Sequence, residues 1–445
     1  MDWQVINAAR SGKYLTLVAV LMTLAAVAAG AGLARGDGKP DRSYGVKGVA
    51  SVDADPLSID SPSDAARDDQ GRIVLGGTTY NGPGGNQAWF ARLNRDGSID
   101  PTFGTAGVAL FSLPGSQFVS TVTIDPEGRI VAAGNWDMPM NRDMWVLRLN
   151  EDGTPDLGFG IGGGSNYDSG QDFDLGFGVA VAGDGLIYLA GSTGDGTNDR
   201  ATIVRYTPDG NPDPTWGVGG AVQLDVGGIS ARAEAIRLDR RGRVVLGGYR
   251  QNADESSDFL AIRLTRKGAL DKSFNGRGYR TIRFVRGQRA DVIDIAVDRR
   301  GRTLLAGGAD FAPDGVSDGL LARLKPNGNL DRRFGKGGKV ARSIFGTRVE
   351  LSRVRIDRAG RIVLAGSAQR ANGTQKALLL RLLSNGRPDR SFAKKGQLQT
   401  SFGEPEASGT TLVIDGKGRY LLGGRVFETG LAYVSRHFAK YPRRK

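Results

Sequence analysis

Residues 119–134, VSTVTIDPEGRIVAAG, contain the pattern that decides the fold. Apolar and polar residues alternate from Val119 to Ile124, which is typical of a half-buried strand. Pro126 presets the first corner of a turn, and Gly128 supplies the positive φ that closes it. The apolar run after Gly128 returns as a second strand, so the stretch predicts an antiparallel β-hairpin.

The same glycine and apolar run occur seven times along the chain. The turn glycines are 57 to 59 residues apart: Gly71, Gly128, Gly185, Gly242, Gly301, Gly360 and Gly418. Self-similarity at a fixed period indicates a repeat architecture, in which each unit buries its apolar faces against its neighbours.

Each unit continues beyond the hairpin with two further strands. In the second unit, residues 144–149 form the third strand, residues 150–153 turn, residues 155–160 cross over, and a fourth strand leads into the next unit. Seven units of four short antiparallel strands predict an all-β fold, a seven-bladed β-propeller of four-stranded blades.

The two ends of the chain are complementary. A crossover motif at residues 40–45 precedes the first complete unit, whereas the last unit stops after its third strand, residues 431–438. We expect the N-terminal strand, residues 49–52, to complete the last blade and close the ring, because closure removes a free sheet edge.

Four features recur in all seven units, and we interpret them as structural. Two small residues end each second strand, where we expect another backbone to approach closely. Each third strand carries an arginine: Arg92, Arg148, Arg205, Arg263, Arg323, Arg381 and Arg436. Each crossover carries an aspartate, Asp41, Asp100, Asp156, Asp213, Asp271, Asp331 and Asp389, with an aromatic residue three positions later. A buried arginine needs an anionic partner, so we predict pairing with the crossover aspartate under the aromatic ring. The alternative is a ring of arginines that binds an anion, but sevenfold repetition favours blade packing.

These residues resemble the delta-60 repeat family of bacterial exported proteins. The matching string is Asp-x-x-Gly-Arg-Ile-Val-Leu-Gly-Gly followed by Ala-x-Arg-Leu-Asn-x-Asp-Gly-x-x-Asp-x-x-Phe-Gly, fullest at residues 71–104 and 125–160. The resemblance implies a β-propeller and carries over no catalytic residue. The chain departs from it in the third unit, where the turn aspartate and arginine are missing, and at Asn275 and Ala393, which replace a glycine.

The N-terminus differs from the repeats. Arg10 and Lys13 precede an uncharged apolar stretch, residues 14–34. This pattern predicts residues 1–34 to be a signal peptide or an N-terminal membrane anchor. The β-propeller is expected over 40–440 and a basic tail over 441–445, with the protein secreted or on the cell surface.

Charge is divided unevenly along the chain. The net charge is +13 and cysteine is absent, which excludes disulfides and thiol chemistry. Residues 231–445 hold 45 Lys and Arg against 20 Asp and Glu, which leaves 15 basic and 27 acidic residues before them. One half of the ring should therefore be basic and the other acidic. This pattern is compatible with an ordinary solvated surface, with docking to an anionic polymer, or with head-to-tail self-association. No nucleic acid partner is expected for an exported chain.

Ligand binding is expected on the face formed by the connections that vary between units. These join the second to the third strand and the fourth strand to the next unit, and loops on a rigid scaffold tend to bind. The candidate residues are Tyr80, Trp136, Tyr249, Phe311, Arg286 and Arg348, with Met138, Met140, Phe427 and Arg289 beside them. Alternatively, these aromatic rings cap the hydrophobic edges of their own blades.

Signals for catalysis are weak. His437 is the only histidine and lies beside the recurrent Arg436, so we expect a structural role for it. Residues 195–199, DGTND, alternate oxygen ligands but lack the glycine and glutamate of a calcium loop, so a polar turn is expected. We predict no catalytic residue, metal or cofactor, and a non-catalytic exported scaffold that binds a cell-surface polysaccharide, anionic polymer or protein. The alternative is an extracellular glycan-active enzyme, a hydrolase or lyase, with carboxylates at the channel mouth.

Overall fold

The computed structural model describes residues 37–55, 58–80, 85–138, 141–285, 287–311, 316–342, 348–369 and 372–440. Residues Gly36–Lys445 form one compact unit, separate from Met1–Arg35. The predicted signal peptide or anchor and the basic tail lie outside the described residues. Within the described ranges all regular elements are strands, and none is a helix capable of crossing a membrane.

The strands form consecutive antiparallel sets of four, as predicted from the repeat. The first two sets are β2(Ile59–Arg67), β3(Ile73–Tyr80), β4(Asn86–Leu93) and β5(Val108–Phe111), then β6(Ser116–Ile124), β7(Ile130–Met138), β8(Asn141–Leu149) and β9(Gly164–Tyr167). The next two are β10(Phe173–Val181), β11(Ile187–Gly194), β12(Arg200–Tyr206) and β13(Ala221–Leu224), then β14(Ser230–Leu238), β15(Val244–Gln251), β16(Ser257–Leu264) and β17(Tyr279–Ile282). They are followed by β18(Arg289–Val297), β19(Thr303–Phe311), β20(Val316–Leu324) and β21(Lys339–Arg342), then by β22(Arg348–Ile356), β23(Ile362–Gln369), β24(Gln375–Leu382) and β25(Gln397–Thr400). A single parallel pair, Phe173 with Arg142, joins the β6–β9 set to the β10–β13 set.

The last sheet combines one strand from the N-terminal end of the propeller repeats with three strands from their C-terminal end. It contains β26(Thr411–Ile414), β27(Tyr420–Arg425) and β28(Ala432–His437) together with β1(Val49–Val52). β1 pairs antiparallel with β28, with Val49 opposite Ser435 and Val52 opposite Ala432. The outer edge of β28 is therefore hydrogen-bonded, as expected from the incomplete last unit.

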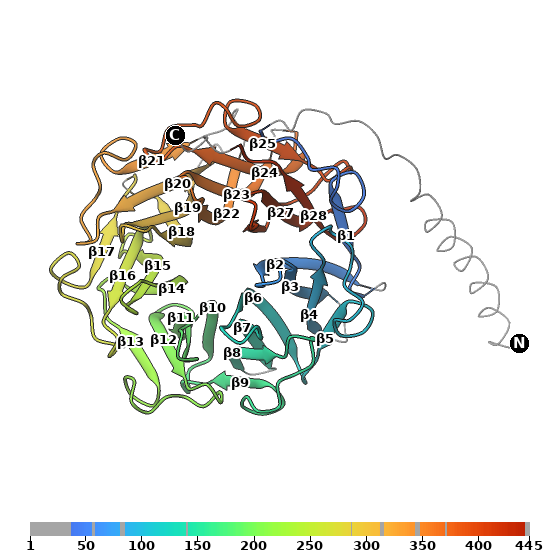
Figure 1. Cartoon of the computed structure of the whole chain (residues 1–445). Coiled ribbons are helices and arrows are strands. Elements are labelled where there is room, and N and C mark those ends of the chain that lie inside the picture. The colour runs from blue at the N-terminus through green and yellow to red at the C-terminus, as the bar shows by residue number, and fades with distance from the viewer. Residues whose placement is uncertain are drawn as a thin grey trace, which may run out of the picture. The chain divides into compact units, whose positions relative to one another are not determined.

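The sheets follow one another in chain order around a common axis (Figure 1). The first strand of each labelled set lies nearest the axis and the fourth lies outermost, so the first strands face one another across the centre (Figure 1).

A β-bulge interrupts the pairing of the first and second strands at the same place in six sheets, for example between Ala233 and Ala235. The second small residue of each pair lies opposite this bulge. A Cβ on Gly248 would lie 1.9 Å from the carbonyl oxygen of Arg232, and one on Gly134 would lie 1.8 Å from that of Phe118. The close backbone approach predicted from the small pair is confirmed, and glycine is there because a carbonyl occupies the Cβ position.

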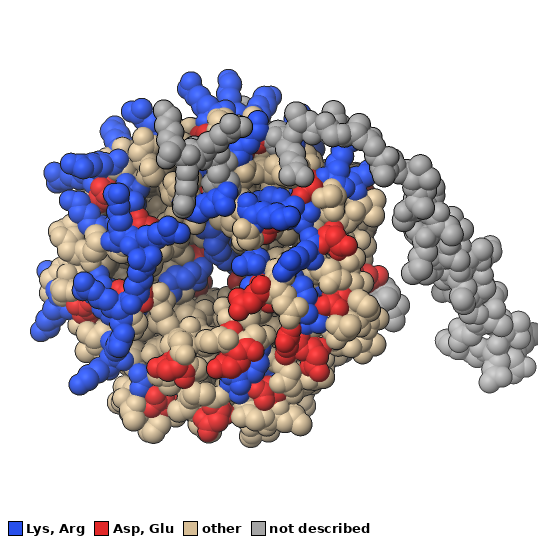
Figure 2. Space-filling view, viewed as in Figure 1, with Lys and Arg blue, Asp and Glu red and all other residues tan. Residues whose placement is uncertain are grey.

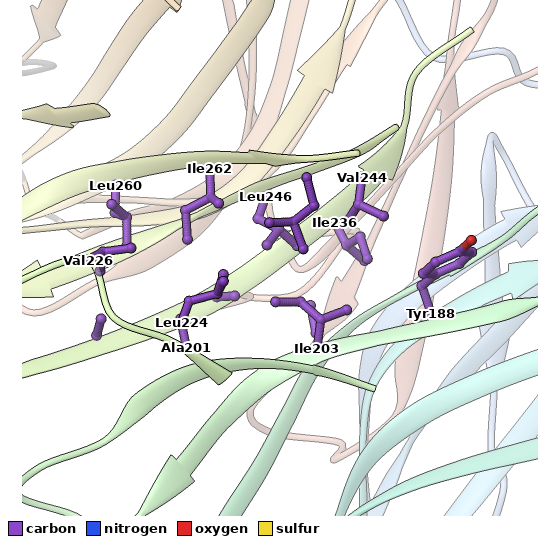
Figure 3. Close-up of a cluster of buried hydrophobic side chains, with 14 of the residues drawn as sticks. Tyr188, Ala201, Ile203, Leu224, Val226, Ile236, Val244, Leu246, Leu260 and Ile262 are labelled. Carbon is purple, nitrogen blue, oxygen red and sulfur yellow. The ribbon is translucent and has the colours of Figure 1, made fainter. Parts of the chain in front are cut away.

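Apolar side chains fill the space between neighbouring sheets. In Figure 3, Tyr188, Ala201, Ile203 and Leu224 of the β10–β13 set face Ile236, Val244, Leu246, Leu260 and Ile262 of the β14–β17 set. Trp89 and Leu75 of the β2–β5 sheet pack in one cluster with Ala50 of β1 and Val434 of β28. The first and last sheets thus share a core of the same kind, and burial of this apolar area is the main stabilising contribution.

Several strands continue further toward the varied connections than the sequence pattern predicts. Trp136 and Met138 lie within β7, Tyr249 lies within β15, and Tyr80 and Phe311 end β3 and β19. The expectation that these residues belong to loops is wrong, because the ladder to the third strand continues up to them, as in the pair Trp136 and Asp143.

Candidate functional site

The recurrent arginines lie in a repeated clamp at the crossover. The described side chains bring every repeat arginine to the aspartate of its crossover: Arg92–Asp100 2.7 Å, Arg148–Asp156 2.7 Å, Arg205–Asp213 2.7 Å, Arg263–Asp271 2.8 Å, Arg323–Asp331 2.9 Å, Arg381–Asp389 2.8 Å and Arg436–Asp41 3.0 Å. The aromatic ring lies 4.5 to 4.9 Å from the guanidinium carbon in each: Phe103, Phe159, Trp216, Phe274, Phe334, Phe392 and Tyr44. The ring shields the pair from water and adds a cation–π contact.

Each clamp also reaches the next sheet. Arg205 donates to the carbonyl of Arg266 at 3.3 Å, in the turn of the following sheet. Arg436 of the last sheet donates to the carbonyl of Arg95 in the first sheet, so the contact that links consecutive sheets also links the last to the first. Arg381 differs, because it binds the carboxylate of Asp37 at 2.5 Å. These guanidinium groups are engaged by ion pairs and hydrogen bonds within the fold, although Nε of the buried Arg205 has no hydrogen-bond partner among the described residues. This engagement favours a structural role.

The arginine that follows the turn glycine belongs to the same network, but its ion pair was not predicted from the sequence. The residue after the turn glycine pairs with the turn aspartate at 2.6 to 2.7 Å in six units: Arg72–Asp68, Arg129–Asp125, Arg243–Asp239, Arg302–Asp298, Arg361–Asp357 and Arg419–Asp415. In the third unit Leu186 occupies this position. The signal was present, since Arg follows the turn glycine in six of seven copies.

Ion pairs also join the innermost strands of different sheets. Arg353 of β22 lies 2.9 Å from Asp64 of β2, and Arg355 lies 2.7 Å from Asp294 of β18. Arg237 of β14 also binds Asp294, at 2.7 Å. Burial opposes ionisation of Asp64, but the charges of Arg353 and Arg355 keep its pKa below the usual value. The network therefore ties the innermost strands of four sheets together.

A cavity of about 540 Å³ runs along these strands, lined by Asp64, Arg237 and Arg355 among others. Glu234, the bulged residue of β14, has a half-buried carboxyl to which no described residue donates a hydrogen bond. Burial raises the pKa of Glu234 to about 8, with the charge of Asp291 adding to the shift and that of Arg232 opposing it. This carboxyl is mostly protonated at neutral pH and could exchange a proton with a bound molecule.

The loop face, formed by the connections from second to third and from fourth to first strands, carries the exposed aromatic rings. Among the described residues the exposed aromatic side chains are Tyr80, Phe173 and Phe427, with exposed fractions of 43%, 39% and 41%. Tyr80 ends β3, Phe173 begins β10, and Phe427 follows β27, so all three lie on this face. Ile59, 47% exposed, lies opposite Tyr80 in the β2–β3 ladder.

The junction of the first and last sheets brings part of this set together. Gly430 accepts a hydrogen bond from the amide of Asp60 at 2.8 Å, so the connection that carries Phe427 lies against the start of β2. Phe427 itself stacks 4.8 Å from the guanidinium of Arg425. Ile59 and Tyr80 are thus exposed apolar residues at the junction to which the connection carrying Phe427 is hydrogen-bonded, and such residues suit a sugar ring or a protein side chain.

The other predicted ligand residues differ in their accessibility. Trp136 is half-buried and donates to the carbonyl of Pro114 at 2.7 Å, while Tyr249 is half-buried 5.8 Å from Arg232. Arg348 is exposed and pairs with Glu350 at 3.0 Å. Arg286 and Met140 lie outside the described residues, as does the side chain of Phe311. Sequence reasoning missed Ile59, Phe173 and Glu234, because each lies in a strand and gives no loop signal.

Three carboxylates meet between β8 and β10. Asp143, Asp168 and Asp174 each place an oxygen within 4.8 Å of the others. Burial and the neighbouring carboxylates raise the pKa of Asp174 to about 6, although Ser169 donates two hydrogen bonds to it. Asn166 donates to Asp143 at 2.7 Å. The carboxylates of Asp143 and Asp174 thus accept hydrogen bonds from Asn166 of β9 and from Ser169 in the loop that follows it.

The two weak chemical signals of the sequence lie in packed surroundings. Asp195 accepts the amides of Thr197 and Asn198, and Asp199 pairs with Arg232 at 2.6 Å, which is the geometry of a polar turn. His437 is 2% exposed, contacts the hydroxyl of Ser435 at 2.9 Å, and burial lowers its pKa to about 4. His437 is therefore neutral at physiological pH.

Five of the seven repeats match a family model of a β-propeller. Five segments, 71–103, 182–215, 242–274, 301–334 and 360–392, match a domain of unknown function, the DUF5122 beta-propeller. Together with the four-stranded antiparallel sheets, this match shows a β-propeller repeat protein. A search of curated proteins gave no match.

Solved structures of similar fold cover most of the chain at low identity. A catalytically inactive virginiamycin B lyase from Staphylococcus aureus with quinupristin is 12% identical, with 88% of this chain and 99% of that chain covered and a TM-score of 0.48. The polysaccharide lyase Uly1 is 12% identical, with coverage of 93% and 92% and a TM-score of 0.49. Sqt1 from Chaetomium thermophilum is 13% identical, with coverage of 87% and 100% and a TM-score of 0.47. Likeness at this level does not bear on activity.

Proposed function

We propose that the protein is a non-catalytic scaffold, a seven-bladed β-propeller closed by β1, that binds a cell-surface polysaccharide or protein partner through its loop face. Support for the closed ring comes from the shared core of the first and last sheets and from the clamp between Arg436 and the turn of the first sheet. The basic and apolar stretches at the N-terminus support export.

One observation supports the loop face as the binding surface. The exposed aromatic side chains of the described residues all lie on the loop face. The opposite face, which is formed by the turns between first and second strands and by the crossovers and is called the turn face, has exposed apolar residues such as Ile161 and Val218 but no exposed aromatic ring among the described residues. Aromatic rings offer a large, rigid contact area at low entropic cost. Their restriction to one face supports the proposal that the loop face is the binding surface.

The test compares matched double variants. The wild type is titrated against an array of cell-wall polymers and glycans, and Tyr80→Ala/Phe427→Ala is expected to weaken the best binding by at least tenfold. Ile161→Ala/Val218→Ala removes exposed apolar groups from the turn face, with exposed fractions of 92% and 88%, and should bind as the wild type does. Equal affinity of the two variants would refute the loop face as the binding surface.

Glu234 favours a second function, that of an extracellular glycan-active enzyme. A carboxyl with a pKa raised to about 8, with the charges of Arg232 and Tyr249 acting on the same group of side chains, can act as a general acid. Turnover of the array glycans by the wild type, abolished in Glu234→Gln with binding retained, would establish this function in place of the scaffold. Absence of turnover on every bound glycan would exclude it for those substrates.

A further inference from the structure

The turns between first and second strands change the sign of their charge around the ring. At the exposed tips of these turns the first three units carry acids and the later units carry bases: Asp69, Glu127 and Asp184, then Arg240, Arg241, Arg299, Arg300, Arg358 and Lys417. These turns and the crossovers form the turn face, opposite the loop face. The change occurs at equivalent positions of one repeated turn, so the backbone does not require it.

The crossovers of the same units add to the basic charge. Their exposed residues include Lys272, Arg277, Arg332, Arg333, Lys336, Arg390, Lys394 and Lys395. Figure 2 shows Lys and Arg gathered over the sheets β14 to β28, whereas Asp and Glu gather over β2 to β13. The uneven charge predicted from the sequence is thus spatially segregated in the fold.

Two grooves run between the sheets of this basic arc. One, of about 600 Å³, is lined by Arg240, Arg241 and Arg243 on one side and by Arg299 and Arg300 on the other. The next groove, of about 520 Å³, is lined by Arg299 and Arg300 together with Arg302, Arg323 and Arg358. Arg299 and Arg300 therefore separate the two grooves and face both.

The acids within these grooves are already neutralised. Asp239 and Asp298 pair with Arg243 and Arg302 at 2.7 and 2.6 Å. Arg299 and Arg300 are exposed, and the described residues include no ion-pair partner for either. Their guanidinium groups are free to form bidentate contacts with carboxylate, sulfate or phosphate groups.

From this arrangement we propose that the turn face of sheets β14 to β25 is a second binding surface, which takes a linear anionic polysaccharide along the two grooves. Successive grooves lined by arginine match a polymer that carries charge on every repeat. A second copy of the chain would present only the smaller acidic arc and would leave most of the bases unpaired. Single-stranded nucleic acid is disfavoured because neither groove is lined by an aromatic residue on which bases could stack.

The experiment measures binding of heparin, a sulfated polysaccharide, and of polygalacturonate, a carboxylated one, at 50 and 200 mM salt, with neutral dextran and duplex DNA as further arms. Arg299→Glu/Arg300→Glu changes both grooves. Arg42→Glu/Lys47→Glu makes the same change of net charge at exposed positions of the crossover before β1, outside sheets β14 to β25. We expect tight, salt-sensitive binding of an anionic polysaccharide that falls at least tenfold in the first variant and less than twofold in the second.

Melting curves serve as the folding control. The unfolding midpoint of both charge variants should equal that of the wild type, because the substituted side chains are exposed. Tyr80→Ala/Phe427→Ala should retain heparin binding, which separates this surface from the loop face. No binding of either anionic polysaccharide, equal losses in the two charge variants, or tighter binding of duplex DNA than of both polysaccharides would each overturn the proposal.

Discussion

Ala393 occupies a backbone position that favours glycine. The equivalent residues Gly104, Gly160 and Gly335 have φ between 53° and 54°, and Ala393 keeps a positive φ of 42°. Left-handed backbone costs a residue with a Cβ about 1–2 kcal/mol. The departure from the repeat at this position therefore leaves the turn intact at a cost in stability.

Replacing Ala393 by glycine should stabilise the protein by about 1 kcal/mol, measured as an increase in the denaturant midpoint, because the strain exceeds the added freedom of the unfolded chain. Ala359→Gly is the matched control, since Ala359 is exposed in a turn with negative φ and should lose stability. A loss of stability in both variants would contradict this account of the turn.

Asp174 makes the stability of the folded protein depend on pH. Burial raises the pKa of Asp174 to about 6 in the folded protein from its ordinary value of 3.8, so folding favours the protonated form. The stability that the protonated Asp174 contributes to the folded protein is fully present below about pH 4 and is lost as the pH rises through 6. The stability of Asp174→Asn relative to the wild type should therefore increase between pH 4 and 7, by on the order of 2–3 kcal/mol. A difference that stays flat in urea titrations across this range would rule out the raised pKa.

At the scale of elements, the β-bulge of the first strand requires a glycine in the second strand, because a carbonyl beside the bulge occupies the position of a Cβ. Gly248→Ala would place a Cβ against the carbonyl of Arg232, and since backbone must move to accept it, we expect a loss of about 2–3 kcal/mol. Gly183→Ala has no neighbour within 4 Å of the added Cβ and serves as the control in the same denaturation assay. Similar stability of the two variants would show that the bulge does not demand glycine.

The turns and the four-strand unit could be predicted because proline, aspartate and glycine act locally and recur at one period. The ends of the strands could not, because hydrogen bonds from the neighbouring strand decide how far a strand continues. Trp136 shows the difference: its sequence context resembles a loop, yet it pairs with Asp143 in the β7–β8 ladder. Prediction of the loop-face residues was limited by the same effect.

At the scale of the whole molecule, the recurrent clamps were accessible to sequence reasoning but the channel network was not. Arg353 and Asp64 are 289 residues apart and meet only because the first strands surround one axis. Glu234 is similar, since its burial comes from the surrounding strands and leaves no mark in its own sequence. Periodic features of the repeat can be predicted, whereas features that depend on contacts between distant strands require the folded chain.

The central claim is that β1 and β28 join the two ends of the chain, and an engineered disulfide tests it most directly. Ser51 and Tyr433 lie opposite each other in the ladder, and the native chain has no cysteine. Directly paired strand residues lie within disulfide range. Ser51→Cys/Tyr433→Cys should form an intramolecular disulfide in the folded monomer, seen as a faster band on a non-reducing gel, whereas Ser51→Cys/Asn327→Cys should not. A reduced monomer, or only intermolecular dimers, from the first variant would contradict the joined ends.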